Sequence, residues 1–106
     1  MGNSSHSGID IRELEISFND FINTSFPEAP EDDDLYDIYS DLVEYDSHIA
    51  GIVSSLLGGK KVNKSLIFLN DDLEKKINAN GNNSELKDIR EYKNKIDNLV
   101  MLIIKK

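Results

Sequence analysis

The sequence predicts an all-α fold, an antiparallel four-helix bundle, on two observations. Apolar residues recur at three- and four-residue steps in four separate segments. Turn-forming residues separate these segments: two prolines, then Gly58-Gly59, then Asn80-Gly81. The 106 residues include no cysteine, so apolar packing must hold the fold without disulfides. We expect a disordered head over residues 1–8 and a single helical domain over 9–106.

The first helix is predicted over residues 9–24. Ile11, Leu14, Phe18 and Phe21 recur along one helical face, and acidic residues enrich its first half. Pro27 and the proline that follows end the helix.

The second helix is the longest and begins after Pro30 with an acidic first turn, Glu31–Asp34. Its apolar seam covers three heptads, a spacing typical of helix bundles. Gly58 and Gly59 end it, and Gly51 inside it costs about 1 kcal/mol relative to alanine. The seam residues are Leu35, Ile38, Leu42, Tyr45, Ile49, Ile52 and Leu56.

The last two helices are predicted over residues 62–79 and from residue 83 or 84 to the end. The third has the stripe Leu66, Leu69, Leu73 and Ile77, with Asn63 or Ser65 as its N-cap. The fourth begins at a cap formed by Asn83 or Ser84. Its apolar positions are Leu86, Ile89, Ile96, Leu99, Val100 and Ile103.

Two short apolar runs leave an alternative fold open. Residues 65–69 and 99–104 are rich in β-branched and leucine side chains, and periodicity cannot separate a buried strand from a buried helix there. A small α+β fold in which these two runs form a strand pair is the alternative.

Charge is distributed unevenly along the chain, whose formal net charge is -8. Residues 1–58 hold 13 acids and one base, whereas residues 59–106 hold seven acids and 11 bases. This acidity excludes a broad nucleic-acid footprint. Such asymmetry indicates either a binding surface or two halves that neutralise each other internally.

Carboxylates gather on one side of the second helix, away from its apolar seam. On a helical wheel Asp34, Asp37, Asp41, Glu44 and His48 fall within about 80° of each other, and we call this row the acidic ridge. Tyrosines lie at its rims, a composition typical of interfaces. The alternative is a solvated helix face. The candidate partner-binding residues are Asp33, Asp34, Tyr36, Asp37, Tyr39, Asp41, Glu44 and His48.

No pattern in the sequence predicts catalysis or a cofactor. His6 and His48 are the only histidines, and Ser47 beside His48 points in a different direction on a helix. The run Asp32–Asp34 lacks the alternating ligands and central glycine of a calcium loop, so we expect no metal site. Phosphate-binding loops are absent. We therefore expect a protein that is not an enzyme.

Two further features concern pairing between charged residues. Asp46 falls close to the apolar seam, so it lies either where water reaches it or in a pair, for example with a lysine of the basic half. The pairs Lys75-Lys76 and Lys93/Lys95 are candidates to face the acidic ridge of a second copy, which would give a homodimer.

In size, acidity, lack of cysteine and helical pattern, the chain resembles the small immunity proteins of bacterial toxin–immunity pairs. The resemblance depends on Asp34, Asp37, Asp41, Glu44 and their tyrosine neighbours. It implies a stoichiometric inhibitor that blocks the active site of a basic, nuclease-type toxin. The alternative is a self-associating structural or adaptor module of a bacterial or phage assembly. We expect no membrane partner and a cytoplasmic location, because the sequence has no long apolar run and no secretory signal.

Overall fold

The computed structural model describes residues 10–104, and within them it is helical with no strand. The predicted all-α bundle is confirmed, and the strand-pair alternative is not supported. The predicted head, residues 1–8, lies outside the described residues. The elements are α1 (Ile11–Ile22), α2 (Asp33–Leu57), the 3-10 turn η2 (Lys64–Leu66), α3 (Asp71–Ala79), the 3-10 turn η3 (Ser84–Leu86) and α4 (Lys87–Ile104).

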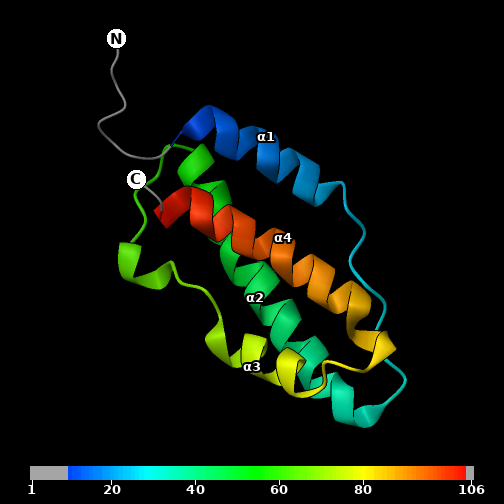
Figure 1. Ribbon diagram of the computed structural model, residues 1–106. Helices are drawn as coiled ribbons and strands as arrows, with labels where there is room; N and C mark the ends of the chain where they lie inside the picture. The colour runs from blue at the N-terminus through cyan, green and yellow to red at the C-terminus, as the bar shows by residue number, and fades with distance from the viewer. Residues whose placement is uncertain (1–9, 105–106) are drawn as a thin grey trace.

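Successive helices reverse direction, so α2 and α4 run the same way through the molecule (Figure 1). These two helices make the most extensive contact in the fold. The antiparallel α1 covers one side of the α2–α4 pair, and the short α3 lies along the other side of α2 (Figure 1). The bundle is therefore a central parallel pair with one helix on each flank.

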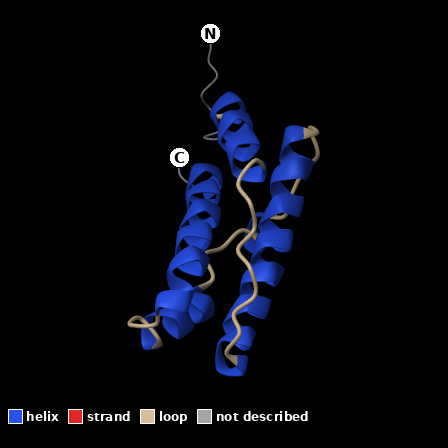
Figure 2. Cartoon of the chain, turned by 90° about the vertical axis from the view of Figure 1, so that its right-hand side faces the viewer, coloured by secondary structure: helices blue, strands red, loops and turns tan. Residues whose placement is uncertain are grey.

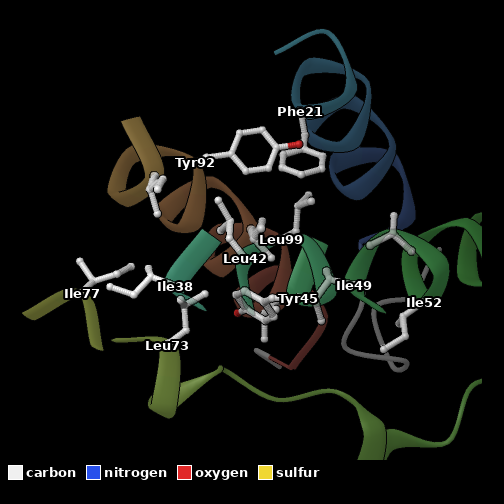
Figure 3. Packing of buried hydrophobic residues seen from close by; sticks show 14 of the residues in the cluster. Phe21, Ile38, Leu42, Tyr45, Ile49, Ile52, Leu73, Ile77, Tyr92 and Leu99 are labelled. Carbon is white, nitrogen blue, oxygen red and sulfur yellow. The ribbon is translucent and has the colours of Figure 1, made fainter. Parts of the chain in front are cut away.

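The core lies between α2 and its neighbours, and the predicted seam of α2 is buried from Leu35 to Ile52. Leu56 is only partly buried, whereas Val53 beside the seam is fully buried. Figure 3 shows the rings of Phe21 of α1 and Tyr92 of α4 close together above the α2 residues, with Leu73 of α3 below them and Ile77 of α3 beside Ile38. The two rings have centroids 5.1 Å apart. Burial of this continuous cluster is the main force that stabilises the fold.

The first and second helices begin at side-chain caps. Asp10 accepts a hydrogen bond from the Glu13 backbone at 3.1 Å, so α1 starts at Ile11 rather than at residue 9. Asp32 caps α2 in the same way. The second helix ends where predicted, and Gly59 then takes a φ of 81°, which glycine adopts without strain.

The predicted third helix is too long, because only Asp71–Ala79 is helical. Asn63 does act as a cap, but it starts a single 3-10 turn that ends at Ile67 in an extended conformation. Asn70 then caps α3 through a 3.0 Å bond to the Leu73 backbone. Leu66 and Leu69 are consequently 47% and 37% exposed instead of buried. Two asparagine caps within eight residues interrupt the helical pattern.

The fourth helix begins with a tighter turn than expected. Asn83 caps the 3-10 turn Ser84–Leu86, and the α-helix follows from Lys87. Leu86 is already buried in that turn. The predicted start is therefore right to within one turn of helix, and every predicted apolar position of this segment is buried.

Candidate functional site

The eight predicted site residues all lie on α2, but they divide into an outward and an inward group. Asp33, Asp34, Tyr36, Asp37 and Glu44 are exposed. The other three residues, Tyr39, Asp41 and His48, are partly buried against the rest of the chain.

Lys76 of α3 neutralises the middle of the acidic ridge. Its Nζ donates hydrogen bonds to Asp37 Oδ2 at 2.8 Å and to Asp41 Oδ2 at 2.6 Å. The bonds to Asp37 and Asp41 raise the pKa of Lys76 above its usual range. The Asp41 side chain is only 26% exposed, so it is largely covered by its contact with α3. The Asp37 side chain is 71% exposed and still faces solvent.

The tyrosines of α2 connect the surface to the core. Tyr36 is 55% exposed, and its ring centroid lies 5.9 Å from that of Tyr39. Tyr39 meets the ring of Phe26 edge-on at 5.6 Å, and Phe26 meets Tyr92 at 4.7 Å. Tyr36 is therefore exposed to a partner, and its ring packs at the outer end of a row of aromatic rings that reaches the core.

His48 contacts the loop between α2 and α3. Its Nε2 donates to the carbonyl oxygen of Leu66 at 2.8 Å, and its ring lies 5.6 Å from that of Phe68. These contacts hold the loop against α2. His48 thus has a structural partner in the chain, and the outward acidic surface ends at Glu44.

The exposed site residues form one surface on the first half of α2, which we call the acidic surface. Its residues are Asp33, Asp34, Tyr36, Asp37 and Glu44. Asp33 and Asp34 lie in the first turn, where the helix dipole favours negative charge. The backbone of Glu31 also donates to Glu85 Oε1 at 3.2 Å, which fastens this end of α2 to η3. The acidic surface therefore lies on a helix whose start is hydrogen-bonded to η3.

Sequence reasoning missed a charged cluster in the core. Lys93 is 3% exposed, and its Nζ donates to Asp97 Oδ2 at 2.7 Å and to Glu74 of α3. Tyr45 of α2 donates to the other oxygen of Asp97 at 2.7 Å. Lys93 thus joins α3 to α4, and Asp97 joins α4 to α2. The signal was present in the sequence, because Lys93 occupies the apolar position between Ile89 and Ile96.

The pKa of each group in this cluster follows from its surroundings. Burial lowers the pKa of Lys93, but the bonds and charges of Asp97 and Glu74 outweigh it and leave the pKa raised. Burial, together with Asp97, raises the pKa of Tyr45. The hydrogen bond and charge of Lys93 lower the pKa of Glu74. Lys93 is therefore charged and Tyr45 neutral at pH 7.

The partner of Asp46 is a tyrosine and not a lysine. Tyr92 of α4 donates to Asp46 Oδ1 at 3.1 Å. Burial raises the pKa of Asp46, and the bond from Tyr92 offsets part of that rise. Of the four lysines proposed to face a second copy, Lys76 and Lys93 pair within their own chain, whereas Lys75 and Lys95 are exposed.

Within residues 10–104, no three carboxylate or imidazole side chains meet in a way that could hold a metal ion. No helix in the same range is both long enough and apolar enough to cross a membrane.

Comparison with known proteins gives no family for the chain. No protein-family model matches it, and no curated protein or solved structure matches it either.

Proposed function

We propose that the protein is a non-enzymatic inhibitor that binds a basic protein through the acidic surface, as an immunity protein binds a nuclease-type toxin. The observation that carries the proposal is the outward row Asp33, Asp34, Asp37 and Glu44 beside the exposed ring of Tyr36. Several carboxylates on one rigid helix attract a cationic active site and speed association. Tyrosine adds apolar contact area at low entropic cost.

Charge repulsion within the surface supports a binding role. Lys76 relieves Asp37 and Asp41, whereas no ion pair of residues 10–104 involves Asp33, Asp34 or Glu44. Asp33 and Asp34 lie four and three residues before Asp37, and Glu44 lies three residues after Asp41, a spacing at which like charges destabilise a helix. A basic partner would remove that repulsion on binding. We also propose a bacterial, cytoplasmic protein, since such an inhibitor must meet its toxin in the cell that makes both.

The test uses the tagged full chain as bait in a low-salt host lysate, with two double variants beside the wild type. Asp33→Lys/Glu44→Lys reverses the acidic surface without touching the Lys76 contacts. Glu13→Lys/Glu15→Lys makes the same change in net charge on exposed positions of α1. Each variant is first checked for wild-type helicity by circular dichroism.

We expect wild type and the α1 variant to retain one basic protein that salt releases, and the α2 variant to lose it. The purified partner is then assayed for nuclease activity with increasing amounts of wild-type protein. Complete inhibition at one equivalent supports the proposal. Equal capture by both variants, or a partner whose activity is unchanged at saturation, would reject it.

A further inference from the structure

The side of α2 that faces away from α4 is uncovered along its whole length. No other helix of residues 10–104 lies over it (Figure 2). Tyr36 and Val43 are 55% and 40% exposed on this side. Small side chains occupy the positions one helical turn away from them, so the face is flat. We call it the outer face; its residues are Tyr36, Ser40, Val43, Ser47, Gly51 and Ser54.

No contact within residues 10–104 requires a glycine at position 51. A glycine inside a helix costs about 1 kcal/mol relative to alanine. A Cβ built at Gly51 would meet no atom within 4 Å, and its φ is that of an ordinary helix. Within residues 10–104, no neighbouring group occupies the space that a side chain at Gly51 would fill. A helix from another molecule could approach α2 closely there.

The loop over residues 58–70 carries the opposite charge beside the second half of α2. Lys60, Lys61 and Lys64 are exposed, and the loop contains no acid. Its ordered conformation holds Leu66 and Phe68 outward, at 47% and 49% exposure. It is fastened to the second half of α2 at Ser55, whose carbonyl accepts from the Lys60 backbone at 2.9 Å, and at His48.

We propose that a second copy of the chain docks on the outer face, with the two α2 helices antiparallel across a two-fold axis near Val43. This arrangement places the acidic first half of each α2 beside the lysine-bearing loop of the other copy, and the symmetry makes that contact twice. It also brings Tyr36 of one copy opposite Gly51 of the other, where the lack of a side chain leaves room for the ring. A parallel pairing would instead set acids against acids.

The inference does not depend on the proposed function, because the dimer forms from purified protein without any partner. The two contacts share Tyr36 and the acids of the first half of α2. A basic partner at the acidic surface would therefore displace the loop of the second copy.

The experiment is light scattering coupled to size exclusion, across a concentration series at low salt. We expect wild type to reach twice the mass of the chain and Gly51→Leu to run as a monomer, since leucine favours the helix but blocks close approach. The matched control is Asn19→Leu on the exposed side of α1, which stays dimeric. Circular dichroism establishes that each variant is folded.

Charge reversal gives a second, independent measurement. Lys60→Glu/Lys61→Glu and Asp33→Lys/Asp34→Lys should each raise the dimer dissociation constant at least about tenfold. An equimolar mixture of the two should restore the dimer, because each loop then meets a face of opposite charge. Lys87→Glu/Lys95→Glu, the same charge change on exposed positions of α4, should leave wild-type association intact.

Two results would overturn the proposal. The first is a wild type that stays monomeric at the highest concentration; if that monomer also co-sediments with phosphatidylserine vesicles, the cationic loop is assigned to a membrane surface instead. The second is a mixture of the reversed variants that remains monomeric while both are folded.

Discussion

Lys93 Nζ lies 2.7 Å from Asp97 Oδ2, one turn along α4, and the lysine side chain is only 4% exposed. The same ammonium reaches Glu74 on α3, while Asp97 also accepts from Tyr45 on α2. A buried charge destabilises the fold unless it is paired with an opposite charge and its hydrogen bonds are satisfied. Besides the packing of Leu73 and Ile77 and the Lys76 ion pairs, Lys93 therefore helps to hold α3 against the central pair.

Lys93→Ala should destabilise the fold by about 3 kcal/mol, because Asp97 is left as a largely buried charge with Tyr45 as its remaining partner. Urea unfolding followed by circular dichroism measures this. Lys95→Ala, at an exposed position two residues on, is the control and should change stability by less than about 0.5 kcal/mol. Equal losses for the two variants would show that the cluster does not stabilise the fold.

The loop before α3 gives a second prediction. Leu73 is fully buried, whereas Leu69 is 37% exposed although it continues the same periodic stripe. Leu73→Ala should cost about 3 kcal/mol through lost burial and the cavity left behind. Leu69→Ala should cost less than about 1 kcal/mol. Urea unfolding curves of both variants measure the two losses of stability. Similar losses would mean that Leu69 is buried like Leu73 and that α3 extends toward residue 62, as the sequence predicts.

That stripe shows where sequence reasoning succeeded and where it failed. The seam of α2 could be predicted because one helix carries the whole pattern between clear start and stop signals. The Leu66–Leu69 segment has the same spacing, but asparagine caps at 63 and 70 decide its local structure. Spacing alone does not show which of two overlapping signals prevails.

The candidate site was predictable in its composition but not in its exposure. The wheel places Asp37 and Asp41 correctly on one side of α2. Their neutralisation by Lys76 depends on the antiparallel register of α3, 35 residues further on from Asp41. Lys93 could have been noticed as a charge at an apolar position. Its acidic partners come from two different helices, and no single-helix pattern brings them together.

Asp46→Asn should stabilise the protein at pH 7. Burial raises the pKa of Asp46 in the folded state, so the fold favours its protonated form. The contribution of Asp46 to stability is present below its unfolded pKa and is lost as pH rises through the folded pKa. Asparagine removes the buried charge and keeps an oxygen for the Tyr92 hydroxyl.

Thermal unfolding at pH 7 and pH 3 provides the measurement for this substitution. We expect a higher melting temperature than wild type at pH 7 and a much smaller difference at pH 3, where the carboxyl is protonated in both states. Asp20→Asn on the exposed side of α1 is the control. A destabilised Asp46→Asn at pH 7 would show instead that the charge of Asp46 strengthens the bond from Tyr92.

Alanine substitutions at Gly51, inside α2, and at Gly59, just after its end, should change stability in opposite directions. Gly51 has an ordinary helical backbone with open space around a Cβ, so Gly51→Ala should stabilise the monomer by about 1 kcal/mol. Gly59 has a φ of 81°, which an L-residue adopts only with strain, so Gly59→Ala should destabilise by about 1 kcal/mol. Urea unfolding at a concentration where the chain is monomeric compares them directly. A loss of stability at Gly51 under those conditions would mean that the glycine serves the single chain, and the space beside it would no longer indicate an approaching helix.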